Sequence, residues 1–226
     1  MRKEEEEEEA KTPRRHAGAD SGLVAGKVTP FTSTRKFSTA WVLHSIGGSA
    51  RLRSMATRFY ARAFKDGVLD RFIEDHGDPH GERLGNWVAE KMGGEGAIWS
   101  NSRPAGARGT AHRRAWYSHK RDRSRRGRRF KVDDCRVWMR LMFWAARDEG
   151  LHEHQPFWDW FVPFIADWIR VYEHSAGRHA RADAEWSADA GSVAAYEGAG
   201  RVMEDVVGGG TAPRAPTGER EGGFYW

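Results

Sequence analysis

This 226-residue chain is poor in cysteine, and Cys135 is the single one. One cysteine excludes an intrachain disulfide framework and fits a reducing compartment. The sequence also lacks an apolar run long enough to span a bilayer. Its first residues have no apolar core of the kind that secretory signals carry, and the acidic run there argues against a transit peptide. We therefore expect a cytoplasmic protein.

Strand patterns are missing as well. Apolar residues recur at spacings of three and four in the middle of the chain, which predicts an all-α fold. The two ends lack this periodicity: the chain opens with MRKEEEEEEAK, and residues 175–226 are rich in Ala, Gly, Asp and Arg. We expect a disordered acidic tail over residues 1–33, a folded domain over residues 34–174 and a mostly disordered tail over residues 175–226.

Positive charge is concentrated in one stretch. Residues 103–131 contain twelve Lys and Arg and one Asp, a local charge of +11 in a chain whose formal charge is +5. The remainder is therefore mildly acidic, at about −6. Residues 95–131 are poor in apolar side chains and predict a loop, apart from an island at residues 111–117 that could form one or two helical turns. Residues 118–131 have the composition of a basic insert.

Helical periodicity predicts five or six helices in the folded domain. The clearest segments are residues 34–46, 50–65, 80–94, 132–149 and 156–174. Gly93 and Gly94 suit the end of the third segment, because glycine tolerates the left-handed geometry of a helix terminus. Asp133 and Asp134 suit the positive N-terminal end of the fourth. The helices are dense in Trp and Phe, which indicates either a bulky core or the enclosure of a large flat ligand.

Four stretches together resemble a known family. They are Gly47-Gly48, RFYARAFKDGVLDRF at residues 58–72, ERLGNWVAEKMGG at residues 82–94, and WMRLM at residues 138–142. In order and spacing the chain is similar to the truncated haemoglobins, closest to their second group, over residues 46–172 except for residues 95–131. The resemblance implies a two-over-two helical sandwich around haem b.

The resemblance also implies roles for single residues. Tyr60 matches the distal tyrosine that donates a hydrogen bond to the iron-bound ligand, and Trp138 matches a tryptophan whose indole N–H points into the distal pocket. His80 falls at the distal position of the ligand-gating helix, and Leu84 falls one turn later against the haem. The chemistry agrees, because iron-bound O₂ carries partial negative charge and Tyr, His and Trp each offer a donor.

The proximal ligand must come from the segment between the third and fourth predicted helices. His112 and His119 are the two histidines there, and we choose His112 as the metal ligand because aromatic neighbours surround it. The family's proximal histidine usually lies closer to the tryptophan matched by Trp138. A second departure is the position usually held by Phe or Tyr after the second helix, where ungapped counting gives Ile73 with Phe72 beside it. We include Phe72 among the haem-contacting residues.

Three function classes follow. The first is a haem protein that binds O₂, NO or CO. Such a protein could serve in sensing, scavenging, NO dioxygenation or peroxidase turnover, and a redox cycle would need a reductase as partner. The second is a nucleic-acid-binding helical module that uses the arginines of residues 103–131. The third is a haem-free, globin-like interaction domain. A visible absorption spectrum of the purified protein distinguishes the first from the other two.

Overall fold

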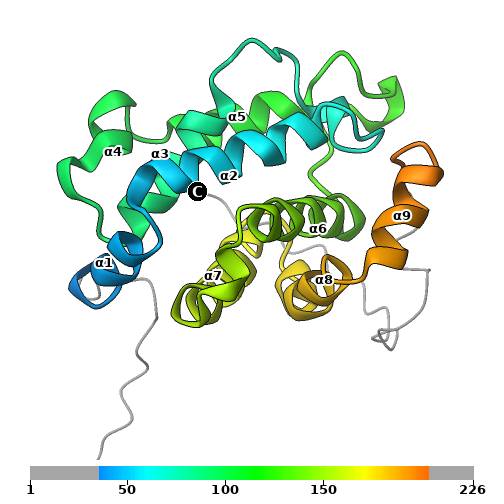
Figure 1. The fold of residues 1–226 in the computed structure, drawn as a ribbon. Helices are drawn as coiled ribbons and strands as arrows, with labels where there is room; N and C mark the ends of the chain where they lie inside the picture. Colours follow the sequence, from blue (N-terminus) through cyan, green and yellow to red (C-terminus); the bar gives the residue numbers. More distant parts are fainter. Residues whose placement is uncertain (1–35, 204–226) are drawn as a thin grey trace, which may run out of the picture.

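The computed structural model describes residues 36–203 and confirms the all-α class within them (Figure 1). That part of the chain forms nine α-helices and no strand, with short 3₁₀ turns between helices. Each helix there is too short or too polar to cross a membrane. The helices are α1 (Lys36–Ser45), α2 (Gly48–Ala63), α3 (His80–Lys91), α4 (Ile98–Ser102), α5 (Ala107–Trp116), α6 (Val132–Asp148), α7 (Gln155–Ile169), α8 (Ala180–Trp186) and α9 (Ala190–Gly198). The tail predicted over residues 1–33 lies outside the described residues.

Local chemistry sets one end each of two predicted helices, α3 and α6. Helix α3 stops where Gly93 adopts a φ of +93°, a conformation that favours glycine. Helix α6 begins where the carboxylate of Asp134 accepts the backbone N–H of Lys131 at 2.8 Å. Both boundaries follow from residues adjacent in sequence, and the sequence predicted both of them to within a few positions.

The backbones of helices α2 and α3 lie against each other with no side chain between them at two glycines of α3. A Cβ added at Gly81 would lie 2.8 Å from the Cα of Thr57, and one added at Gly85 would lie 2.5 Å from the Cα of Arg53. Real Cβ atoms essentially never come so close to backbone atoms. The two glycines therefore allow a helix contact that any larger residue would push apart.

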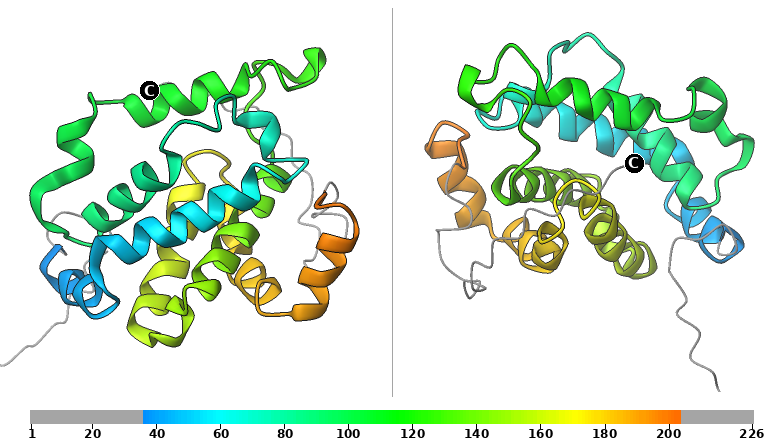
Figure 2. Two further views of the ribbon diagram at one scale, coloured as in Figure 1. Left: turned by 45° about the horizontal axis from the view of Figure 1, so that its top comes forward. Right: turned by 180° about the vertical axis from the view of Figure 1, so that it is seen from behind.

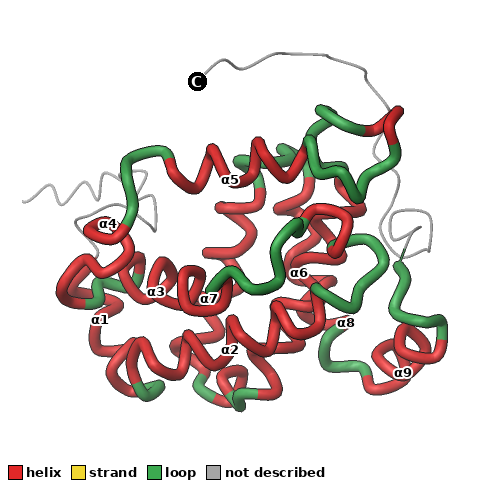
Figure 3. The backbone as a smooth tube through the Cα atoms, turned by 90° about the horizontal axis from the view of Figure 1, so that it is seen from above, coloured by secondary structure: helices red, strands yellow, loops and turns green. Residues whose placement is uncertain are grey.

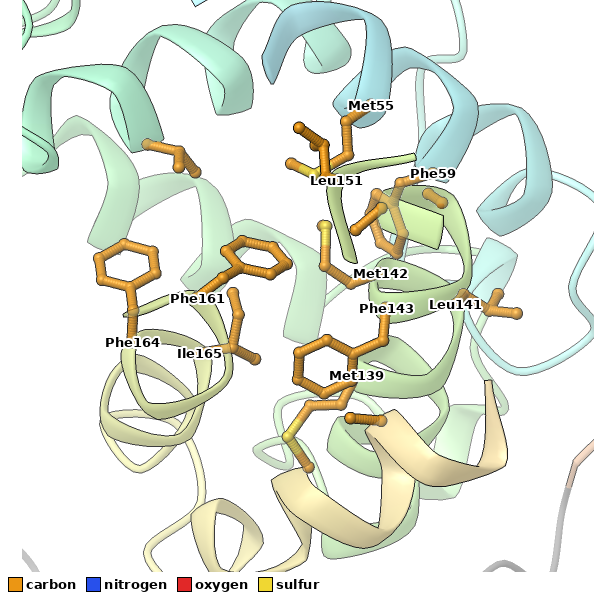
Figure 4. Close-up of a cluster of buried hydrophobic side chains, with 14 of the residues drawn as sticks. Met55, Phe59, Met139, Leu141, Met142, Phe143, Leu151, Phe161, Phe164 and Ile165 are labelled. Atoms are coloured by element: carbon orange, nitrogen blue, oxygen red, sulfur yellow. The ribbon is translucent and has the colours of Figure 1, made fainter. Parts of the chain in front are cut away.

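The core lies between this helix pair and the layer formed by α6 and α7 (Figure 1). Figure 4 shows Met55 and Phe59 of α2 meeting side chains of α6 and α7. All of the largest fully buried side chains belong to this cluster: Phe59, Phe143, Phe157, Phe161, Phe164, Leu52, Met55, Met92, Met139, Leu141, Met142 and Leu151. Burial of so many aromatic and thioether groups stabilises the stacked layers through the hydrophobic effect and dispersion.

The expectation of a mostly disordered tail from residue 175 needs correction. The chain continues through a 3₁₀ turn, η6 (Ala176–His179), into α8, which lies beside α6 and α7, and then into α9 at the edge of the molecule (Figure 2). Asp183 of α8 is fully buried and accepts hydrogen bonds from Arg136 at 2.8 Å and Arg140 at 2.9 Å. This buried polar contact helps to hold α8 in place. A search for apolar periodicity does not detect a helix that is held in this way.

Residues 95–131 are more ordered than predicted. They hold α4 and α5, and the latter begins four residues before the predicted island. Seen from above, α5 runs along one side of the molecule and leads into the loop that precedes α6 (Figure 3). Helix α5 has no fully buried residue and makes little close backbone contact with other described helices, so side chains connect it to the rest of the fold.

Candidate functional site

Three of the residues predicted for the distal side come together around Phe59. The rings of Tyr60 and His80 stack with their centroids 4.9 Å apart. Phe59 touches Tyr60 at 4.9 Å and Trp138 at 5.3 Å, in both cases edge to face. Leu84 is half-buried and packs against the same core. Ring contacts thus connect residues of α2, α3 and α6 through Phe59 and Tyr60, and that these side chains surround one bound ligand stays a prediction.

Two hydrogen-bond donors in this cluster have no partner within residues 36–203. They are the hydroxyl of Tyr60 and the indole N–H of Trp138, and both side chains are half-buried. Burial, and to a lesser degree neighbouring Tyr172, raises the pKa of Tyr60 to about 12. The phenol therefore stays protonated over the physiological range and keeps its donor.

One ring nitrogen of His80 is engaged within the described residues. Its Nε2 lies 2.8 Å from the backbone carbonyl of Asp75. A carbonyl only accepts hydrogen bonds, so Nε2 carries the proton and donates it to the loop before α3. That proton is not offered to a ligand, and the imidazole acts instead as a flat surface against which Tyr60 is stacked.

His112 has the geometry of a metal-ligating imidazole. Its Nδ1 lies 2.7 Å from the backbone carbonyl of Arg108, one turn earlier on α5, and therefore carries the proton. The ring stacks on Tyr172 at 4.4 Å, and burial lowers the pKa of His112 to about 4. The imidazole is therefore neutral at pH 7 with an unprotonated Nε2, and an N–H held by a carbonyl is the usual second-shell arrangement of histidine ligands.

The alternative ligand, His119, lacks these features. Its side chain is 73% exposed and lies 3.5 Å from the carboxylate of Glu74. Of the two histidines, only His112 is therefore a largely buried imidazole whose Nδ1 proton is held by a backbone carbonyl. Phe72, predicted to contact the cofactor, packs edge to face on Phe130 at 4.9 Å, and Phe130 reaches the His112 ring at 6.0 Å.

Sequence reasoning missed Arg108. Its guanidinium lies 4.2 Å from the ring centroid of Trp168 and 4.9 Å from that of Trp87, and it forms no ion pair within the part of the chain that the structure describes. Burial lowers the pKa of Arg108. The indole N–H of Trp168 is buried without a partner in the same region. The signal for Arg108 was its position four residues before His112, but the predicted helical island began too late to include it.

The pKa of His112 makes a measurable contribution to stability. An unfolded histidine titrates near about 6.5, so between that value and about 4 the folded chain binds fewer protons than the unfolded chain. Without cofactor, the free energy of unfolding should therefore fall as the pH falls through this window, by at most about 3 kcal/mol. Urea unfolding at pH 7 and pH 4 should show a smaller fall for His112→Gln than for wild type; equal falls would contradict the assignment.

No protein-family model matches this sequence, no curated protein matches it, and no solved structure matches the fold. Within residues 36–203, no three His, Cys, Asp or Glu side chains gather so that they could hold a bare metal ion. An open groove of about 500 Å³ along α7 and η6 includes none of the predicted site residues. The functional assignment therefore depends on the geometry around Tyr60, Trp138 and His112.

Proposed function

We propose that this chain is a b-type haem protein that binds a diatomic ligand, with O₂ as the main candidate. The observation that carries the proposal is the pairing of His112, a neutral imidazole with a free Nε2, with two unused donors on Tyr60 and Trp138. Tyr172 connects the two sides, since it stacks on His112 and also contributes to the raised pKa of Tyr60. A two-over-two arrangement is compatible with α2 and α3 lying over α6 and α7.

The surroundings of these residues suit an internal recess. Tyr60, His112 and Tyr172 are desolvated strongly enough to shift their pKa values, yet each keeps some accessible surface. Side chains that are desolvated but still partly accessible are expected to line a narrow space between helices. We infer that such a space lies between α5 and the distal cluster, because α5 has no fully buried residue and makes little close backbone contact with the other described helices.

The residues around this space fit haem. His112 would hold the iron, and Leu84, Phe72 and Phe130 would give the porphyrin an apolar surface. Arg108 is a cation among aromatic rings with no carboxylate partner in residues 36–203, so it fits a propionate. Bound haem would supply reversible ligation of O₂, NO or CO.

The distal donors then determine how long a ligand stays. Tyr60 and Trp138 would each donate a hydrogen bond to a partly negative ligand in a site with little water. Two donors predict slow ligand release, which suits sensing, scavenging or redox turnover better than bulk transport. The choice of reaction depends on the reductant and the haem as much as on the chain.

The test is an absorption spectrum. Protein purified after expression with a haem precursor, or titrated with haemin, should show a Soret band, and reduction under CO should shift it. A colourless protein that takes up no haemin would contradict the proposal and leave a nucleic-acid-binding module or a haem-free interaction domain as the remaining interpretations.

Ligand release tests the distal donors. A hydrogen bond to a partly charged ligand is worth roughly 1.5–3 kcal/mol, so Tyr60→Phe and Trp138→Phe should each speed O₂ release by roughly ten- to a hundredfold. CO carries less charge and should respond much less. His80→Leu should change O₂ release by less than about threefold, because the Nε2 proton is already engaged by Asp75. Stopped-flow measurements that show unchanged O₂ release in both phenylalanine variants would contradict the polar-pocket mechanism.

A further inference from the structure

The loop between α5 and α6, residues 117–131, is held rigidly by its own arginines. Arg121 is buried, and its guanidinium donates to the backbone carbonyls of Trp116 at 2.6 Å and Arg128 at 2.7 Å. Arg126 donates in turn to the carbonyl of Arg121 at 3.1 Å. We call this segment the basic loop. Its fixed shape means that the outward-facing side chains of the loop start from defined positions.

The basic loop is also attached to the body of the protein. Lys120 pairs with Asp70 at 2.9 Å, and the guanidinium of Arg121 lies 4.7 Å from the ring centroid of Phe72. Phe130 packs on the rings of His112 and Trp116, at 6.0 Å in each case. The loop therefore lies directly against the ring cluster that contains the proposed iron ligand.

The surface of this region is strongly cationic and unpaired. One acidic residue, Asp122, lies in the loop, and it accepts hydrogen bonds from the backbone and hydroxyl of Ser124. Eight exposed cations of α5 and the basic loop form no ion pair within residues 36–203: Arg113, Arg114, Arg123, Arg125, Arg126, Arg128, Arg129 and Lys131. Like charges held close together repel each other, so the arrangement costs stability unless a negatively charged surface binds there.

We propose that the basic loop is the docking face for an acidic one-electron carrier protein, a flavin or iron–sulfur protein. The proposal rests on the haem function above. In the complex, the reduced carrier would lose one electron and ferric haem iron would gain it, with no bond made or broken. Charge complementarity of this kind accelerates encounter and orients the partner, which suits a short-lived redox complex.

A protein partner fits this face better than a nucleic acid does. Single-stranded nucleic acids bind by stacking bases on exposed aromatic rings along a basic groove. Here Trp116 and Phe130 are half-buried and face the ring cluster, and the indole N–H of Trp116 is buried. Tyr117 is 63% exposed but lies against Gly127, which leaves one aromatic ring where a stacking platform needs several.

The test uses an acidic plant-type ferredoxin as the probe, with the full-length protein. Binding is measured by calorimetry at low salt, about 20 mM, and at about 500 mM, where the Debye length is only a few ångströms. The variant Arg123→Gln/Arg125→Gln/Arg128→Gln removes three exposed cations that form no ion pair. The matched control, Arg170→Gln/Arg178→Gln/Arg181→Gln, removes three exposed charges from the α7–α8 region.

We expect the loop variant to weaken ferredoxin binding by about tenfold or more at low salt and the control to change it by less than about twofold. Haem reduction by ferredoxin should slow in parallel, while reduction by dithionite stays unchanged. Equal effects of the two variants, binding insensitive to salt, or tighter binding of a single-stranded oligonucleotide than of ferredoxin would overturn the proposal. Binding is measured independently of haem, so failure of haem uptake remains a separate result.

Discussion

Replacing His112 with glycine is expected to release haem more than about a hundredfold faster than from the wild-type protein, or to leave the protein unable to retain it. The reason lies in the proposed ligation: Nδ1 is held by the carbonyl of Arg108 and the ring is stacked on Tyr172, so Nε2 would be the coordinating atom. Haem transfer to an excess of apomyoglobin measures the loss. Added imidazole should restore binding to His112→Gly by occupying the space that the side chain left.

His119→Gly is the matched control for this experiment. It removes a histidine seven positions later in the same basic region, but one that is 73% exposed. Its haem retention and spectrum should stay near wild type. If His119→Gly loses haem and His112→Gly keeps it, the ligand assignment moves to the basic loop and the role given to α5 is wrong.

Replacing Asp183 with alanine is expected to destabilise the protein by about 3–5 kcal/mol. The carboxylate is fully buried and receives hydrogen bonds from Arg136 and Arg140, whose side chains are 7% and 16% exposed. Without it, two largely buried guanidinium groups lose the carboxylate that accepts their hydrogen bonds. Urea unfolding followed by circular dichroism measures the change in the free energy of unfolding.

A surface ion pair provides the comparison. Glu197→Ala removes the exposed pair, 3.2 Å apart, between Glu197 of α9 and Arg201 just after that helix, and should cost less than about 0.5 kcal/mol. A second comparison replaces the whole buried group, as Arg136→Met/Arg140→Met/Asp183→Leu, which should recover much of the stability because no charge is left unpaired. A loss below about 1 kcal/mol in Asp183→Ala would show that the anchor contributes little to the docking of α8.

The sequence was most informative where structure is local. The bounds of α3 and α6 follow from apolar periodicity, from the glycine at position 93 and from Asp134, all within a few residues of the helix ends. The gathering of Tyr60, His80 and Trp138 followed from a resemblance that extended over three helices, and the structure does bring these residues together. In a helix, the separation of two residues in the sequence determines the distance between their side chains, so features of this kind can be predicted from the sequence.

Other features depended on contacts between distant segments. Helices α8 and α9 bury a few small or aromatic side chains, and two long-range polar contacts also hold them: Asp183 with α6, and Tyr196 with Asp66 at 2.9 Å. The stacking of Tyr172 on His112 joins positions sixty residues apart. The hydrogen bond of His80 to Asp75 depends on the conformation of a loop. No periodicity encodes such pairings.

The glycine contact between α2 and α3 affects how the molecule fluctuates. Backbones that touch at Gly81 and Gly85 cannot separate by small steps, so Tyr60 on one helix and His80 on the other move as parts of a single rigid body. Amide hydrogens of this helix pair should exchange with deuterated solvent only when the whole domain opens, whereas those of α4 and α5 should exchange through smaller local openings. Small molecules would then enter past α5, where local openings are more frequent, while Tyr60 and His80 keep a constant spacing.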